Sequence, residues 1–396
     1  MDLTFTPAQQ AWRAAARAWI AANLPEGWRG GTFAGPDDED EGARQQRDWE
    51  RRLHAAGYAG VGWPRAYGGQ GLGVVEQLII NEELGRAAAP EGVNTVGMEL
   101  VGPILLAAGT EEQKRSLIPR ILAVDTIWCQ GFSEPEAGSD LAAVRTEAVR
   151  DGDAWVINGQ KLWTTHARHA DLCLLLARTD ASVPKHRGLT LLIVPMDAPG
   201  VVARPLVTIA GRREFAEVFF QDVRVPLDAT VGPVNEGWRV AAGVLEVERG
   251  TLRLYRQQRF LHEFEHLLRV ATETEAMRTR VAHNAHFRQR LAEIYAELAI
   301  QRYHNLKLVS RMLAGEKVGA EVSITKLFWS EMHQRLTALA FDVLGPEGVA
   351  SGRSTTGAGR FQDLLLHCRF ETISAGTSQI QRNIIAERML GLPRQA

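Results

Sequence analysis

The spacing of apolar residues changes twice along this chain, and this change limits its fold more than any other feature. Over residues 6–125, apolar residues such as Trp12 and Ala16 recur every three or four positions, which is the spacing of one helix face. Between about residues 128 and 232, short β-rich runs follow one another with turn residues between them. From about residue 238 onward the helical spacing returns. We therefore expect helices, then a β domain, then a helical bundle.

These changes of pattern give an α+β fold with three predicted domains, at residues 1–125, 126–232 and 233–396. Within the middle domain, the pair Asn158-Gly159 separates two short runs of strand-forming residues. An Asn-Gly pair in such a setting is a strong hairpin signal. The sequence therefore predicts a hairpin that turns at this pair.

The composition excludes several classes of function. Lysine and arginine number 45 against 47 aspartate and glutamate, a formal net charge of −2, so we expect no nucleic-acid partner. The three cysteines are too few and too scattered for a disulfide framework or a thiolate zinc site, so we expect no metal. No secretory signal is visible, and no apolar run approaches the roughly 20 residues of a membrane span. We expect a cytoplasmic protein without membrane insertion.

Several motifs are more specific than these patterns. Residues 128–140 read WCQGFSEPEAGSD and residues 157–165 read INGQKLWTT, and no Rossmann or P-loop glycine pattern occurs. Together with YGG at 67–69, EGW at 236–238 and AGTSQIQR at 375–382, these segments resemble the acyl-CoA dehydrogenase family, in the family's order. The resemblance implies a helical domain, a β-barrel-like domain and a C-terminal four-helix bundle, in agreement with the periodicity.

The resemblance also implies FAD as the cofactor, with Gln130, Phe132, Ser133, Trp163 and Thr165 at its isoalloxazine ring. A buried flavin ring needs hydrogen bonds at its polar edge and a flat apolar partner at its face, because unpaired buried polar atoms are costly. Ser133, Thr165 and the backbone near Gln130 can supply the hydrogen bonds, and Trp163 can stack on the ring. Taken alone, Trp163 would be interpreted as a core aromatic residue and Ser133 as a turn residue.

Four further positions match the family's ligand contacts. Ser139 corresponds to a contact with the pantetheine arm of the substrate, and Arg249 to a residue that assists binding of CoA. Thr377 and Gln379 correspond to positions that face FAD. Each also has an ordinary interpretation: a turn serine, a surface cation of a helix, and the first turn of a helix with Thr377 near its N-cap.

The reaction implied is oxidation of an acyl thioester to its 2,3-enoyl form, in which a base removes a proton from C2 while hydride leaves C3 for the flavin. Many members carry that base, a glutamate, directly before the Gly-Thr-x-Gln motif, but here this position is Ala375. Isovaleryl-CoA dehydrogenase and others carry it in a Leu-x-x-Glu-Arg motif, which here reads LEVER at residues 245–249. The resemblance therefore implies that Glu248 is the base.

The helical spacing separates Glu248 from Glu246 without reference to the family. Glu246 has a cation, Arg249, three positions away, which is typical of a solvated salt bridge. The residues three and four positions from Glu248 carry no charge: Val244, Leu245, Thr251 and Leu252. A carboxylate on an apolar face is a stronger base, which suits removal of a weakly acidic C–H proton. The alternative is that a distant arginine merely pairs with Glu248.

Ala375 can still contribute through its backbone. The family supplies two hydrogen bonds to the thioester oxygen as it becomes enolate-like, one of them from the amide N–H at this position. The small side chain also leaves room near C2 and C3, so we expect tolerance of branched or ring-bearing acyl groups.

Two segments depart from the family pattern. Residues 275–290 lack the Arg-x-x-Phe-Gly element that reaches a neighbouring subunit's FAD in homotetrameric members. The Gln-x-x-Gly-Gly-x-Gly element appears as DVLGPEG at 342–348, and the acid at its first position, Asp342, is unfavourable beside a diphosphate. Both departures concern the adenosine half of FAD, as in heteromeric acyl-CoA dehydrogenases of steroid side-chain catabolism. We expect either a heteromer with a second acyl-CoA dehydrogenase-like chain or a homo-oligomer with rearranged FAD contacts.

The expected electron acceptor is an electron-transfer flavoprotein. Two alternatives stay open at this point: a flavin oxidase or monooxygenase on the same fold, and a non-catalytic partner subunit of a heteromeric dehydrogenase, which Ala375 would favour. The acyl group is also open, and an acyl-carrier-protein thioester is an alternative to acyl-CoA because both carry pantetheine.

Overall fold

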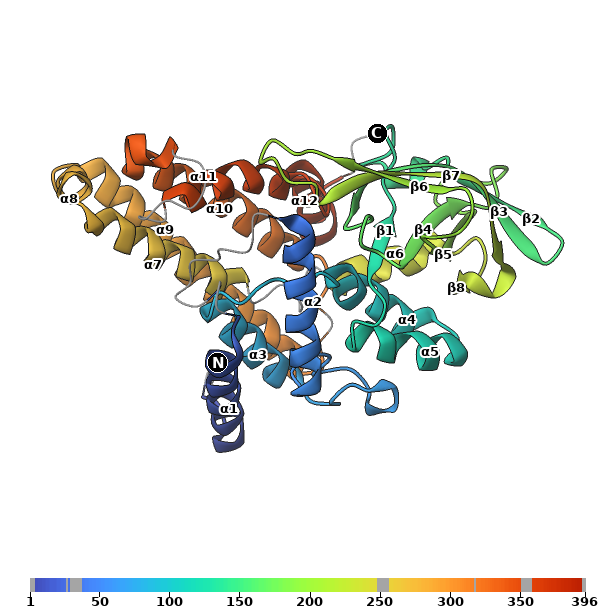
Figure 1. Ribbon diagram of the computed structural model, residues 1–396, viewed down its shortest axis with the longest axis horizontal. Helices are drawn as coiled ribbons and strands as arrows, with labels where there is room; N and C mark the ends of the chain where they lie inside the picture. Colours follow the sequence, from blue (N-terminus) through green and yellow to red (C-terminus); the bar gives the residue numbers. More distant parts are fainter. Residues whose placement is uncertain are drawn as a thin grey trace. The chain divides into compact units, whose positions relative to one another are not determined.

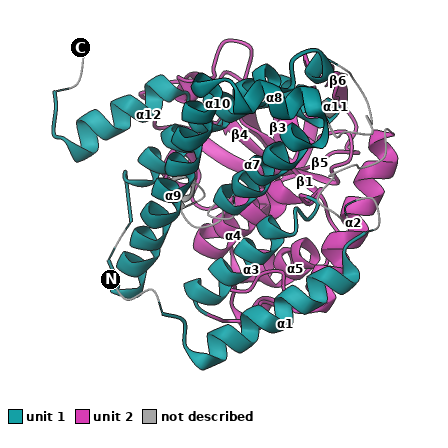
Figure 2. Cartoon of the chain, turned by 90° about the vertical axis from the view of Figure 1, so that its left-hand side faces the viewer, with its two compact units in different colours: residues 1–36, 73–90, 249–396 teal, residues 37–72, 91–248 magenta. Residues whose placement is uncertain are grey.

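A computed structural model of the protein describes residues 4–25, 28, 38–247, 256–316, 318–349 and 358–393, with the backbone alone at 243–247 and 358. The chain divides into two compact units, coloured separately in Figure 2. Unit 1 comprises Met1–Pro36, Gly73–Pro90 and Arg249–Ala396, and unit 2 comprises Asp37–Leu72 and Glu91–Glu248. Both units therefore contain segments from the N-terminal part of the chain.

Unit 2 contains the sheet, whose strands are green in Figure 1. Its order is β6-β7-β3-β2-β4-β5-β8, and β1 lies parallel to β4. The β-rich middle part of the chain is thus confirmed. The strands are β1 (Trp128–Gly131), β2 (Glu147–Asp151), β3 (Ala154–Thr165), β4 (Leu172–Arg178), β5 (Leu189–Pro195), β6 (Val201–Leu206), β7 (Phe215–Pro226) and β8 (Thr230–Val231).

The predicted hairpin at Asn158-Gly159 is wrong. β3 runs without a turn through this pair, and β2 joins β3 at the preceding turn, where Asp151 pairs with Ala154. Gly159 instead marks a register shift between β3 and β7, and a Cβ atom there would lie 2.5 Å from Oγ1 of Thr146. The long partner strand β7 holds β3 extended across the pair, so tertiary pairing overrides the local turn signal.

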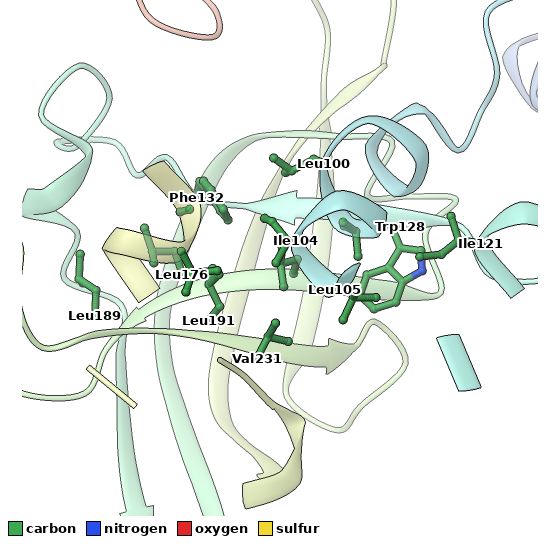
Figure 3. Close-up of a cluster of buried hydrophobic side chains, with 14 of the residues drawn as sticks. Leu100, Ile104, Leu105, Ile121, Trp128, Phe132, Leu176, Leu189, Leu191 and Val231 are labelled. Atoms are coloured by element: carbon green, nitrogen blue, oxygen red, sulfur yellow. The ribbon is translucent and has the colours of Figure 1, made fainter. Parts of the chain in front are cut away.

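Two apolar cores cover the sheet of unit 2. In one, residues of β1, β4 and β5 pack against helices α4 (Gly102–Ala108) and α5 (Glu111–Leu122). Figure 3 shows Phe132, Leu176 and Leu191 in this core together with Ile104 and Trp128. The other core contains alternate residues of β3, β4, β5 and β7. Helices α2 (Glu39–Ala55) and α6 (Gly237–Val247) complete the unit, together with the short helices η2 (Arg65–Tyr67), η3 (Gly97–Val101), η4 (Leu141–Ala143) and η5 (Leu227–Ala229).

Unit 1 is helical, as the returning periodicity predicts. Helices α7, α8, α9, α10 and α11 share one apolar core, to which Phe264, Leu298 and Leu336 contribute. α1 begins at a capping box formed by Thr6 and Gln9. The helices are α1 (Pro7–Asn23), α3 (Val74–Arg86), α7 (Arg256–Glu273), α8 (Glu275–Ala282), α9 (Ala285–Leu313), α10 (Val322–Leu344), α11 (Ala358–His367) and α12 (Ser378–Ile384), with short helices η7 (Gly345–Val349), η8 (Cys368–Thr372) and η9 (Ile385–Met389).

The α+β class, with helical parts on either side of the β-rich part in sequence, is therefore as expected. Within the described ranges, no helix combines the length and the apolar character that crossing a membrane requires.

Candidate active site

Strand β1 leads directly into the first candidate flavin segment. Gln130 lies partly exposed in this strand, and Phe132 beyond it is buried in the core of Figure 3. Two successive carbonyl oxygens then accept hydrogen bonds from β3: that of Phe132 from Nζ of Lys161 at 3.0 Å, and that of Ser133 from the backbone N–H of Leu162 at 2.8 Å. In the described part of the chain, neither the N–H nor the hydroxyl of Ser133 has a partner. Both groups are therefore available to a ligand.

A buried ion pair between Lys161 and Glu134 holds this segment against β3. Lys161 is fully buried, and its Nζ lies 2.8 Å from Oε1 of Glu134. Glu134 also accepts the backbone N–H groups of Arg145 and Thr146, at 2.7 and 2.8 Å. Burial lowers the pKa of Lys161 to about 8, because Glu134 offsets only part of the lost hydration. Burial alone would raise the pKa of Glu134, but Lys161 and the hydrogen bonds outweigh it and bring that pKa below its ordinary value.

Trp163 and Thr165 lie at the end of the same strand, β3. The register between β3 and β7 shifts between Lys161 and Thr164, and Trp163 has a left-handed backbone with φ 58°. Its indole is 57% exposed and meets the ring of Phe215 edge-on at 6.0 Å. An exposed indole at a bulge with positive φ is typical of a ligand contact, since such bulges re-aim side chains. Thr165 is partly buried and pairs with Phe215.

Ser139 lies exposed in the turn that follows the first flavin segment. Its neighbour Asp140 forms an ion pair with Lys185, with 2.6 Å between Oδ2 and Nζ. The guanidinium of Arg178 donates to the carbonyl oxygens of Ala142 and Lys185, at 2.6 and 3.0 Å. These contacts fix the turn while leaving the Ser139 hydroxyl at the surface.

In unit 1, the C-terminal motif forms a tight turn before α12. Ala375 and Gly376 both have positive φ, 51° and 85°, a conformation that is uncommon and strained for alanine. The buried amide of Gln381 donates to the carbonyl oxygens of both residues, at 3.0 and 3.1 Å. The Thr377 hydroxyl accepts a backbone N–H three residues on and caps α12, while Gln379 is exposed on the first helical turn. The N-cap interpretation of Thr377 is thus confirmed.

A second buried cation, His333 of α10, pairs with the segment that precedes this turn. Nδ1 of His333 on α10 is 2.7 Å from Glu371 of η8, and its Nε2 is 3.0 Å from Glu263 of α7. Burial alone would lower the pKa of His333, but the two carboxylates raise it to about 10. The pKa of Glu263 is lowered to about 2, because His333, Arg360 and Arg259 outweigh its burial. Since Glu371 precedes Ala375 by four residues, this triad anchors the approach to the turn.

Glu248 and Arg249, the predicted base and CoA contact, lie outside the described residues. Helix α6 is described up to Val247. Of the remaining predicted residues, Gln130, Phe132, Ser133, Trp163, Thr165 and Ser139 lie in unit 2, and Ala375, Thr377 and Gln379 lie in unit 1. Hydrogen bonds of neighbouring residues bring Ser133 and the end of β3 together, and Ala375, Thr377 and Gln379 share one turn.

Three consecutive parts of the chain match the domains of one enzyme family. Residues 6–125 match the acyl-CoA dehydrogenase N-terminal domain, residues 129–223 its middle domain and residues 235–390 its C-terminal domain. The chain belongs to the acyl-CoA dehydrogenase family. This acyl-CoA dehydrogenase is 44% identical over 393 residues to Acyl-CoA dehydrogenase IpdE1 of Mycobacterium tuberculosis, with 97% of this chain and 98% of the relative covered.

Solved structures of this family share the fold over the whole chain. The Tcur3481-Tcur3483 steroid ACAD matches with a TM-score of 0.88 at 33% identity, covering 100% of both chains. The ChsE4-ChsE5 complex from Mycobacterium tuberculosis matches with a TM-score of 0.84 at 32% identity, again covering 100% of both. The predicted family, fold class and enzyme class are therefore confirmed for this acyl-CoA dehydrogenase.

Acyl-CoA dehydrogenases are FAD-dependent flavoproteins, so FAD is the cofactor. Ser133 and Trp163 of unit 2 have the chemistry needed to hold the isoalloxazine ring of FAD. The free N–H and hydroxyl of Ser133 match the polar edge of an isoalloxazine ring, and the exposed indole of Trp163 matches its face.

The two segments that depart from the family pattern contact each other. Nη1 of Arg290 on α9 lies 2.7 Å from Oδ2 of Asp342 on α10. Arg280 of α8 donates to the carbonyl oxygen of Val343 at 2.7 Å, and its guanidinium fills the space where a side chain on Gly345 would lie. Cations that would suit a diphosphate are thus engaged within this chain of the acyl-CoA dehydrogenase.

Sequence reasoning did not identify Lys161 or His333 in this acyl-CoA dehydrogenase. Lys161 occupies an inward-facing position of β3, where the neighbouring inward residues Ile157 and Thr164 are uncharged. The only sequence signal was a lysine at a core position of a strand, which is rare without a partner. For His333, the partners Glu263 and Glu371 are 70 and 38 residues away, so no local pattern connects the three.

Proposed function

We propose that this acyl-CoA dehydrogenase oxidises the CoA thioester of a bulky, steroid-derived acyl group to its 2,3-enoyl form, with Glu248 as the base. The observation that carries the reaction is the match of all three family domains in order. The Tcur3481-Tcur3483 steroid ACAD structure, at 33% identity over the whole chain, supports the substrate class. The small side chain of Ala375 agrees with a bulky group near C2 and C3.

The proposed roles follow from what each reacting atom needs. Glu248 takes the proton from C2, and its uncharged sequence neighbours favour a basic carboxylate. The N–H of Ala375, which has no partner in the described part of the chain, donates to the thioester oxygen as negative charge develops there. Gln381 holds this N–H in place through the adjoining carbonyl groups. FAD, when bound, accepts the hydride that leaves C3.

We further propose that the chain works in a heteromer. Two contacts support this: Arg290 pairs with Asp342, and Arg280 donates to the Val343 carbonyl. Both arginines lie in residues 275–290, the part that corresponds to the element by which homotetrameric members reach a neighbour's FAD, and both are occupied within this chain. A second acyl-CoA dehydrogenase-like chain would then complete the adenosine half of the site. The electrons pass to an electron-transfer flavoprotein.

The base is tested with Glu248→Gln, which keeps the shape of the side chain and removes its basicity. We expect turnover to fall by roughly 10³-fold or more with flavin content unchanged, since general-base catalysis contributes about 10²–10⁴-fold. Glu246→Gln, two residues away in the same motif, is the matched control and should keep its rate. Equal activity of both variants would overturn the assignment of Glu248.

The assembly is tested by purifying the chain alone and together with a second acyl-CoA dehydrogenase-like chain. We expect full flavin content and bleaching by steroid acyl-CoA only in the mixed complex, under anaerobic conditions. Full flavin content in the chain alone would contradict the heteromer and leave the reaction intact. Rapid reoxidation of the reduced complex by air would instead indicate an oxidase.

A further inference from the structure

We propose that Lys161 is a positioning residue that aims the Ser133 N–H at the flavin ring. This inference rests on the proposed function, because it concerns the same ring-binding segment. It adds a residue that contacts neither flavin nor substrate but sets the direction of a group that does.

The peptide unit between Phe132 and Ser133 sets the direction of the Ser133 N–H. A trans peptide is planar, and its carbonyl and N–H point in opposite directions. The Phe132 carbonyl and the Ser133 N–H belong to the same peptide. Because Nζ of Lys161 holds that carbonyl at 3.0 Å on the β3 side, the Ser133 N–H must point away from β3. The N–H has no partner in the described ranges, so it is presented to a ligand.

The position of Nζ is itself fixed. Lys161 is fully buried, and its Cγ lies 3.5 Å from the place where a Cβ on Gly131 would be, so β1 passes directly over the lysine stem. Nζ also donates to Glu134 at 2.8 Å. Glu134 is held in turn by two backbone N–H groups at 2.7 and 2.8 Å. The ammonium group therefore cannot move without breaking buried hydrogen bonds, which is costly.

The same strand also carries the other ring contact. Leu162 donates its backbone N–H to the Ser133 carbonyl at 2.8 Å, and Trp163 follows with its exposed indole. Residues 161–163 thus supply a side-chain anchor, a main-chain anchor and a stacking ring in succession. Lys161 therefore fixes the Ser133 N–H, which meets the edge of the flavin ring, in a set position relative to the Trp163 indole, which meets the face of the ring.

The experiment compares three variants, each in the complex that binds FAD. Lys161→Met removes the anchor but keeps the length of the side chain. Glu134→Gln removes the carboxylate charge and one of the two acceptor oxygens that the backbone N–H groups of Arg145 and Thr146 use, but leaves Lys161 in contact with the Phe132 carbonyl. Val225→Ala, a core truncation in β7 away from this segment, controls for general loss of stability.

The readouts are the Kd for FAD, the flavin absorbance maximum and the flavin midpoint potential. For Lys161→Met we expect the Kd to rise about tenfold, the effect of one well-aimed hydrogen bond, with a shifted absorbance maximum. Val225→Ala should stay within about threefold of the native Kd, and Glu134→Gln, which keeps Nζ at the Phe132 carbonyl but loses the carboxylate that holds it, should lie between Val225→Ala and Lys161→Met. If Lys161→Met does not fold, the double variant with Glu134→Gln leaves no unpaired buried charge and should show the same tenfold rise.

Other outcomes overturn the proposal. An unchanged Kd and spectrum for Lys161→Met would show that the Ser133 N–H needs no anchor. Equal losses for Lys161→Met and Glu134→Gln would show that the pair acts only through its charge balance. A native complex that takes up no flavin would instead overturn the proposed function, and this inference with it.

Discussion

Each compact unit buries a cation close to a turn that carries predicted site residues, and the pKa values of these two cations are shifted in opposite directions. Lys161 lies in the sheet of unit 2 with its pKa lowered to about 8, and His333 lies in the helical bundle of unit 1 with its pKa raised to about 10. Both are fully buried, so burial disfavours the charged form of each. Lys161 faces one carboxylate, and His333 lies between two.

This difference follows from the charges that surround each cation, because burial alone would lower both pKa values. One carboxylate that is itself held by backbone N–H groups offsets only part of the desolvation of Lys161. Two carboxylates, each within 3.0 Å of an imidazole nitrogen, more than offset it for His333. The charged form of Lys161 is therefore less favoured in the folded protein than in water, whereas the charged form of His333 is more favoured, so the stability of unit 1 depends on the His333 charge.

The largest expected effect comes from His333→Gln, which removes the cation that Glu263 and Glu371 share and leaves each of them to arginines 3.3 to 3.9 Å away. We expect unit 1 to lose about 3–5 kcal/mol of unfolding free energy, as for other broken buried pairs. Denaturant unfolding followed by helical circular dichroism measures it. Arg335→Gln is the matched control, because Arg335 lies on the same helix in a half-exposed pair with Glu297 at 2.6 Å. A native unfolding midpoint for His333→Gln would show that the stability of unit 1 does not depend on this buried charge.

The two buried cations give the stability of the protein opposite dependences on pH above neutrality. His333 binds more protons in the folded than in the unfolded state between pH 6.5 and about 10. Its contribution is complete below pH 6.5 and is lost as the pH rises through 10, by up to about 1.4 kcal/mol per pH unit. Lys161 has the opposite sign: the folded state binds fewer protons between pH 8 and 10.5, so its stability contribution rises there.

On the acid side, the pKa of Glu263 is lowered to about 2, so its contribution is present above pH 4.5 and lost as the pH falls through 2. Thermal unfolding over pH 3–10, compared between native protein, His333→Gln and Lys161→Met, separates the contributions of the two cations to stability. Parallel curves for the two variants above pH 8 would contradict the opposite signs.

The smallest expected effect concerns Arg290→Gln, which breaks an ion pair of 2.7 Å at the surface. Arg290 and Asp342 are both partly exposed, so we expect less than about 1 kcal/mol of lost stability. FAD content of the complex should not change, since this pair serves the chain internally. A clear fall in FAD content would show that Arg290 contacts the cofactor after all.

The sequence predicted those parts of the protein that depend on short-range patterns. Helical and β-rich regions follow from residue spacing, and the Thr377 cap follows from the residue types around it in the sequence. The family motifs, whose residues are close in sequence, predict the candidate flavin segment, and its role at the flavin stays a prediction. The hairpin at Asn158-Gly159 failed for the opposite reason: β7, about 60 residues later, pairs with β3 on both sides of this turn signal.

The order of elements, the family and the residue types available to a flavin can be inferred from the sequence alone. The contacts that support these residues become visible in the fold: Lys161 holds the Phe132 carbonyl, His333 lies between Glu263 and Glu371, and Arg290 pairs with Asp342. Burial and pairing of charges depend on residues tens of positions apart. Local spacing sets a helix or a strand, but it does not set which charges meet inside.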